Sequence, residues 1–133
     1  QGQHLVTRMT MALGMTVIAT RNSGTDGPDY VAEVGLADKL LPFAARADVI
    51  VSTLPLTPET KGLMNKAFFD AAKRGALFIN VGRGGTVDTD DLVAALNDGR
   101  LGGAGLDVTD PEPLPAEHPL SRAPNVIITP PVA

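Results

Sequence analysis

The sequence contains no cysteine and no tryptophan, and its aromatic residues are four phenylalanines and one tyrosine. The absence of cysteine excludes disulfide scaffolds, thiol nucleophiles and thiolate metal sites. No apolar run approaches the roughly 20 residues that a membrane-spanning helix needs, so we expect no membrane partner. Neither histidine has a partner at a spacing that would build a ligand set, so we also expect no metal.

Positive charge is scarce as well. The chain has 11 Lys and Arg against 15 Asp and Glu, and its net charge is −4. Because no basic cluster is present to neutralise phosphates, we expect no nucleic-acid partner. In contrast, 44% of the 133 residues are hydrophobic, which is ample for a packed core. Composition and length therefore predict one soluble, cytoplasmic domain.

Helical and strand patterns alternate along the chain. Apolar runs predict strands at residues 16–19, 48–53, 76–79, 104–108 and 126–129. Helices are predicted at residues 4–13 and 40–46, from the cap Asn65 to a stop at Gly75, and from Thr89 to a stop at Gly99. Strands that are apolar throughout and separated by helices indicate an α/β fold with a doubly wound parallel sheet, covered on both faces. Ligands bind such sheets at the carboxyl ends of the strands.

Two of the predicted strand exits carry polar residues suited to chemistry. Arg83 lies among glycines after one buried strand, and its planar guanidinium suits a carboxylate ligand. The alternative is a glycine-rich turn with a solvated arginine. After the next strand, Glu112 stands between Pro111 and Pro113. A carboxylate held in this way could orient a catalytic group or could be a surface turn acid, and each segment alone leaves both interpretations open.

Five short segments, most of them at the strand exits, occur in one order and spacing along the chain. The series runs PLTPET at 55–60, NVGRG at 80–84, LDV at 106–108, EPL at 112–114 and NVIITP at 125–130. It strongly resembles the D-isomer-specific 2-hydroxyacid dehydrogenases, over nearly the whole chain from about residue 3. The resemblance implies a Rossmann-like nucleotide-binding domain from a two-domain, usually dimeric family. It also implies hydride transfer between NAD(P)H and C2 of a small 2-keto or 2-hydroxy acid such as glyoxylate or hydroxypyruvate.

The resemblance assigns roles to individual residues. Arg83 takes the position that binds the substrate carboxylate and polarises its carbonyl, and Glu112 takes that of the glutamate that orients the catalytic histidine. Asp107 corresponds to a residue near the nicotinamide amide. The remaining matches to dinucleotide-lining loops are Leu54, Pro55, Thr60, Val81 and Gly82. Formate dehydrogenases share the overall pattern but carry Gln-Pro where this chain has Glu112-Pro113, which disfavours that activity.

The catalytic histidine of the family is missing from its expected place. Pro131 follows Thr129-Pro130 where the family has that histidine, and proline has no titratable proton. The histidines of this chain are His4 and His118, and His118 matches a loop position that is usually structural. Unless another group substitutes, we expect strongly impaired oxidoreductase activity. The alternatives are recruitment of His118 and a catalytically silent dinucleotide-binding interaction module.

The glycine fingerprint of a dinucleotide fold is also incomplete. The first strand and the first two glycines of G-x-G-x-x-G are absent, and Gly2 is the candidate for the last glycine. Since that strand normally lies in the middle of the sheet, its loss would leave two strand edges unpaired. We therefore expect residues 1–133 to be an N-terminally truncated part of the NAD(P)-binding domain, without the substrate domain.

The residue after the strand at 16–19 bears on the choice of cofactor. NAD-specific members carry an acid there that hydrogen-bonds the ribose 2′-hydroxyl, and this position falls at Arg21. Arg21 can instead pair with a 2′-phosphate, aided by Asn22 and Ser23. The sequence therefore predicts a preference for NADP, with NAD possible. The alternative is a solvated loop arginine in an NAD-binding protein.

Overall fold

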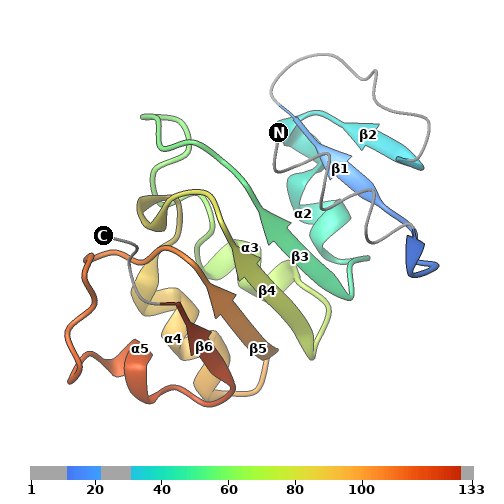
Figure 1. Ribbon diagram of the computed structural model, residues 1–133. Helices are drawn as coiled ribbons and strands as arrows, with labels where there is room; N and C mark the ends of the chain where they lie inside the picture. Colours follow the sequence, from blue (N-terminus) through green and yellow to red (C-terminus); the bar gives the residue numbers. More distant parts are fainter. Residues whose placement is uncertain (1–11, 22–30, 130–133) are drawn as a thin grey trace. The chain divides into compact units, whose positions relative to one another are not determined.

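The computed structural model describes residues 12–21 and 31–129. The chain divides into two compact units, Gln1–Phe43 and Ala44–Ala133 (Figure 1). Several sequence predictions lie outside the described residues: most of the helix at 4–13, the loop at 22–28, and the positions Gly2, His4, Asn22, Ser23 and Pro131.

The first unit contains a small parallel sheet. Strands β1 (Ile18–Thr20) and β2 (Glu33–Gly35) pair with Ile18 opposite Glu33, and the 3-10 helix η1 (Ala37–Lys39) follows. Strand β1 begins two residues later than predicted. The sequence did not predict β2, because three residues with an exposed glutamate and a glycine carry no apolar run. Helix α2 (Leu40–Ala44) ends two residues earlier than predicted.

The second unit is built on a parallel sheet in the order β3-β4-β5-β6. Its strands are β3 (Val49–Ser52), β4 (Ala76–Asn80), β5 (Leu101–Leu106) and β6 (Val126–Ile128), and α3 (Lys66–Ala71), α4 (Thr89–Asn97) and α5 (Pro119–Arg122) connect them. The predicted α/β class with parallel sheets is confirmed. The described strands form two sheets, one in each unit, and the loss of the first strand of the fold stays a prediction.

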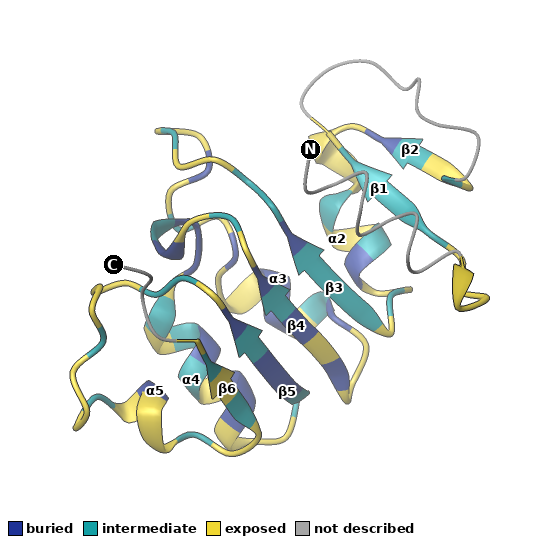
Figure 2. Cartoon of the chain, viewed as in Figure 1, coloured by how far each residue is buried: buried dark blue, intermediate teal, exposed yellow. Residues whose placement is uncertain are grey.

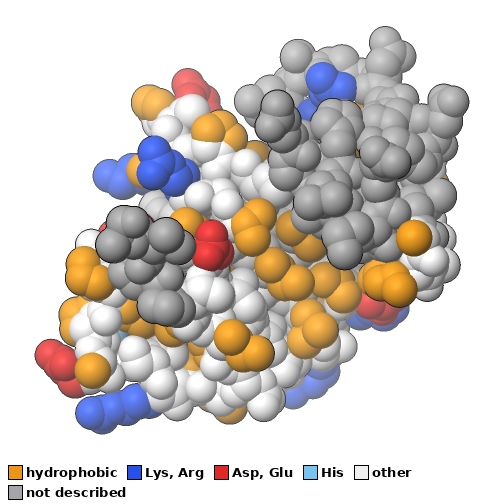
Figure 3. All heavy atoms as spheres, viewed as in Figure 1, with side chains coloured by type: hydrophobic (Ala, Val, Ile, Leu, Met, Phe, Trp, Pro, Cys, Tyr) orange, Lys and Arg blue, Asp and Glu red, His pale blue; other side chains and the backbone are white. Residues whose placement is uncertain are grey.

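One face of the four-stranded sheet carries the core. Phe78 of β4 packs edge-on against Phe68 and Phe69 of α3, with ring centroids 6.3 and 5.5 Å away. The buried residues of α3, α4 and β4 appear dark blue in Figure 2. On the other face, Leu77 is 45% and Ile127 is 73% exposed. Figure 3 shows hydrophobic side chains gathered on the side of the unit turned toward the viewer.

The start of α3 agrees with the sequence prediction, whereas its end does not. The Asn65 side chain accepts a hydrogen bond from the Phe68 backbone N–H at 3.2 Å, which confirms the predicted cap. The predicted end of α3 at Gly75 was wrong, because Ala72 is extended and the helix stops at Ala71. Gly75, with φ +85°, instead forms the turn into β4. Among the described residues, no helix has the length and apolarity needed to cross a membrane.

Candidate active site

Two buried polar side chains fix the backbone at Arg83. Asn80 and Thr86 are 1% and 0% exposed, and both donate to the Arg83 carbonyl, at 3.1 Å from Asn80 Nδ2 and 2.7 Å from Thr86 Oγ1. Asn80 Oδ1 also accepts from the Gly82 N–H at 3.0 Å. We call residues 80–86 the Arg83 loop. Because buried polar groups are costly when unpaired, these bonds select one conformation of the loop.

Unlike the Arg83 backbone, the Arg83 side chain is not held in place by hydrogen bonds to described residues. It is exposed and makes no hydrogen bond or ion pair with any residue that the structure describes. Its guanidinium is a permanent cation with a planar set of donors. A fixed backbone carrying an uncommitted guanidinium is an arrangement suited to binding an anion.

Glycines bring the Arg83 loop against two neighbouring strand exits. A Cβ atom at Gly82 would lie 2.5 Å from the Leu54 carbonyl oxygen, just after β3. A Cβ atom at Gly84 would overlap the Thr109 carbonyl group, just after β5. Only glycine therefore permits these backbone contacts. As a result, the exits of β3, β4 and β5 meet at the carboxyl edge of the sheet, where parallel α/β sheets bind ligands.

The two predicted acids line one pocket. A pocket of about 200 Å³ lies between the exit of β5 and the end of β6, and we call it the Asp107–Glu112 pocket. Its lining residues are Asp107, Thr109, Glu112, Pro113, Leu114, Ile128 and Thr129. Glu112 is exposed and makes no hydrogen bond with any described residue, and the Asp110–Pro111 and Glu112–Pro113 peptide bonds are cis. Asp107 and Glu112 therefore line the same pocket, and their contact with a ligand stays a prediction.

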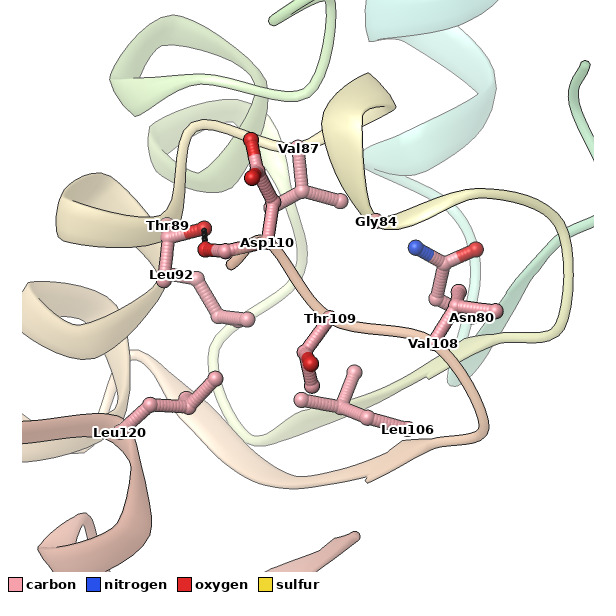
Figure 4. A pocket seen from close by; sticks show the side chains of 10 residues that line it. All are labelled: Asn80, Gly84, Val87, Thr89, Leu92, Leu106, Val108, Thr109, Asp110 and Leu120. Atoms are coloured by element: carbon pink, nitrogen blue, oxygen red, sulfur yellow. Dashed lines mark hydrogen bonds between the residues drawn. The ribbon is translucent and has the colours of Figure 1, made fainter. Parts of the chain in front are cut away.

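The packing between the Arg83 loop and the β5 exit leaves almost no space. The crevice there has a volume of about 10 Å³, and Figure 4 shows Asn80 and Gly84 facing Thr109 and Leu106 across it. Thr89 Oγ1 closes one side by donating to the Asp110 carbonyl at 2.9 Å. A volume of this size holds at most one water molecule. The crevice is therefore a packing contact and no ligand site.

The predicted cofactor residues of the β3 exit form a tight loop. Thr60 is buried, and its hydroxyl donates to the Pro55 carbonyl at 2.6 Å. Thr60 thus shapes the loop that carries Leu54 and Pro55. Val81, at the end of β4, is exposed, while its N–H donates to the Ser52 carbonyl at 3.0 Å. Direct contact of these residues with a cofactor stays a prediction.

His118 and Arg21 belong neither to the Arg83 loop nor to the lining of the Asp107–Glu112 pocket. His118 caps α5, with Nδ1 accepting from the Leu120 N–H at 3.1 Å, and it does not line the Asp107–Glu112 pocket. This bond occupies one ring nitrogen and supports a structural role for His118. Arg21 follows β1 in the first unit, where its N–H donates to the Gly35 carbonyl. Within residues 12–21 and 31–129, no cluster of three potential metal ligands occurs.

Three residues whose side chains form hydrogen bonds at the site were not predicted from the sequence. Asn80 and Thr86 were not assigned roles, although a polar residue at the end of an otherwise apolar strand is a usable signal. Thr129 was also missed; its hydroxyl donates to Asp107 Oδ1 at 2.6 Å. Ser52 is buried as well, but its hydroxyl has no hydrogen-bond partner in the described part of the chain.

Comparison with known proteins identifies the family. The model of the family described as "D-isomer specific 2-hydroxyacid dehydrogenase, NAD binding domain" matches residues 1–133. The chain belongs to this family.

Its relatives within the family include glyoxylate reductases. The chain is 52% identical over 88 residues to the human glyoxylate reductase/hydroxypyruvate reductase, covering 66% of this chain and 27% of that protein. It is 47% identical over 124 residues to an uncharacterised protein of Corynebacterium melassecola, covering 92% of this chain and 40% of the relative. The chain thus spans less than half the length of these two relatives.

A solved structure of the family has the same fold. It is an NADPH-dependent glyoxylate/hydroxypyruvate reductase from Sinorhizobium meliloti, crystallised in complex with NADP and sulfate. It superimposes with a TM-score of 0.86 at 40% identity, covering 93% of this chain and 40% of that one.

The glycine contacts of this dehydrogenase domain can be tested by a matched pair of substitutions. Gly84→Ala forces a methyl group into the Thr109 backbone, and we expect it to lower the free energy of unfolding by about 2–3 kcal/mol. Gly85→Ala meets only the half-exposed Leu56 side chain, which can move, and should cost less than about 1 kcal/mol. Urea denaturation measures both, and equal losses would contradict the proposed packing.

The hydrogen bonds to Arg83 allow a second test. Thr86→Val removes a buried hydroxyl that has a partner, and it should lower the free energy of unfolding by about 1–2 kcal/mol. Ser52→Ala removes a buried hydroxyl without one and should leave stability unchanged or higher. Thermal unfolding of both variants gives the comparison, and a larger loss for Ser52→Ala would refute this ranking.

Proposed function

We propose that the chain is the NAD(P)-binding part of an oxidoreductase that transfers a hydride between NAD(P)H and a small 2-keto or 2-hydroxy acid. Glyoxylate and hydroxypyruvate are the candidate substrates. The observation that carries the proposal is the uncommitted Arg83 guanidinium on a rigid loop, next to strand exits that carry Asp107 and Glu112. The activities of the human and Sinorhizobium relatives support this choice.

Arg83 is the residue proposed to bind the substrate. Two parallel N–H donors of its guanidinium match the two oxygens of a carboxylate, and the charge strengthens both hydrogen bonds. Its fixed carbonyl limits how far the side chain can swing, since Asn80 and Thr86 hold the peptide in place. The same cation can polarise the adjacent keto oxygen of the substrate and so favour hydride addition at C2.

A nicotinamide dinucleotide would supply the hydride when bound. Leu54, Pro55, Val81, Gly82 and Asp107 are proposed to line its site, with Thr60 shaping the loop. By resemblance, Gly2, Arg21, Asn22 and Ser23 are also proposed as cofactor-binding residues. The close backbone contact of Gly82 with Leu54 joins the exits of β3 and β4, and Asp107 Oδ2, which no described residue engages, is available to such a ligand. Arg21 favours NADP over NAD because it can pair with the 2′-phosphate, and the Sinorhizobium relative binds NADP.

Proton transfer is the step of the proposed reaction for which the expected position, 131, carries no titratable group. Glu112 is exposed and could orient a proton-transferring group, but position 131 holds proline, which cannot donate or accept a proton. The only nearby histidine in sequence, His118, has Nδ1 committed to the cap of α5. We therefore propose that turnover is impaired. The second candidate function, which Pro131 favours, is a silent dinucleotide-binding interaction module.

The organisation of the intact protein is part of the proposal. Residues 1–133 would form part of the NAD(P)-binding domain, and a separate domain would complete the substrate site. By resemblance the intact protein would be a homodimer, and its composition favours a cytoplasmic location.

Ligand binding tests the proposed function directly. We expect the intact protein to bind NADPH more tightly than NADH in calorimetric titrations, and to bind oxalate, a mimic of the keto acid, once NADPH is present. Arg83→Gln should weaken oxalate binding by about 10- to 100-fold, since it removes a charged bidentate donor, while NADPH affinity stays the same. Arg122→Gln, which removes an exposed arginine of α5, is the matched control.

Each part of this test can fail separately. Failure to bind either nucleotide would refute the dinucleotide site, and tighter binding of NADH would refute the NADP preference. Unchanged oxalate affinity in Arg83→Gln, or the same loss in Arg122→Gln, would refute the role of Arg83.

Turnover distinguishes the enzyme from the silent module. We expect Pro131→His to raise the rate of NADPH oxidation with glyoxylate by about 100-fold or more, because general acid–base catalysis contributes that much. Pro131→Ala is the control that relieves the proline without adding a titratable group. If the unmodified protein turns over as fast as the histidine variant, the proposed impairment is wrong; if neither turns over while both bind NADPH, the module is favoured.

A further inference from the structure

Thr129 is joined to Asp107 across the ends of two strands. Its hydroxyl lies 2.6 Å from Asp107 Oδ1 and 3.4 Å from the Leu106 carbonyl oxygen. A hydroxyl has one proton to donate, and the shorter distance and the negative charge direct it to the carboxylate. The Thr129 N–H donates separately to the Leu106 carbonyl at 2.9 Å, so the backbone pairing of β6 with β5 does not depend on the hydroxyl.

The hydrogen bond from Thr129 restrains the carboxylate end of the Asp107 side chain. Asp107 is exposed, and among the residues that the structure describes Thr129 is the only hydrogen-bond partner of its side chain. Its backbone N–H donates to the Asn80 carbonyl at 3.0 Å, which fixes the start of the side chain. The Thr129 hydroxyl fixes the other end by engaging Oδ1, and Oδ2 remains available as an acceptor. Both residues line the Asp107–Glu112 pocket.

We propose that Thr129 is a positioning residue for the cofactor, acting through Asp107. By holding Oδ1, it orients the carboxylate so that Oδ2 is ready to accept a hydrogen bond from an amide N–H donor, the group that the nicotinamide carboxamide presents. Ordering the carboxylate before binding lowers the entropy cost of binding. This inference rests on the proposed function. A purely structural Thr129 would stabilise β6 without any link to Asp107.

A double-mutant cycle separates these two roles. Titrating NADPH into the intact protein, we expect Thr129→Val to weaken binding by about three- to tenfold, because the Asp107 carboxylate must then be ordered when the cofactor binds. Thr129→Ser keeps the hydroxyl and should stay within about twofold of the unmodified protein. In the Asp107→Ala background, Thr129→Val should change the affinity no further. Thr129→Ala serves as a second hydroxyl-free variant if the valine protein does not fold.

The outcomes are distinguishable. Unchanged affinity in the hydroxyl-free variants, or an equal loss with and without Asp107, would overturn the positioning role while leaving the proposed function intact. If the unmodified protein binds neither NADPH nor NADH, the proposed function itself is refuted and this inference falls with it.

Discussion

The carbonyl group of Arg83 is the point on which the site depends. Asn80 and Thr86 are almost completely buried, and the side chains of both donate a hydrogen bond to this one oxygen. Breaking the arrangement would leave buried donors unpaired, so the loop cannot drift without a large cost. Gly82 and Gly84 then allow the same loop to touch the exits of β3 and β5 directly. One rigid loop thereby aligns three strand exits.

Charges of opposite sign lie on different strand exits. The cation Arg83 lies on the β4 exit, whereas the acids Asp107 and Glu112 line a pocket after β5. The chain belongs to the D-isomer-specific 2-hydroxyacid dehydrogenase family. Proline at position 131 has no titratable proton, and the proposed impairment of turnover rests on this residue. Under this proposal, cofactor binding and turnover would be separable properties.

The sequence predicts the elements that depend on local signals. The cap Asn65 and the strand at 76–79 were found because a capping residue and a continuous apolar run are readable within a few residues. Strand β5 starts three residues earlier than predicted, because Leu101 is followed by two glycines that give no strand signal. The end of α3 was missed for a related reason: nothing local marks Ala72 as extended. Contacts such as Gly84 with Thr109 join distant segments and cannot be derived from spacing.

A crystal structure of the intact protein with NADPH and oxalate tests the role of Arg83 most directly. The Arg83 guanidinium should hold the oxalate carboxylate through two hydrogen bonds of about 3 Å. The Arg83 carbonyl should keep its bonds to Asn80 and Thr86. Oxalate bound by a different cation, or an Arg83 loop rebuilt around the ligand, would contradict this role of Arg83.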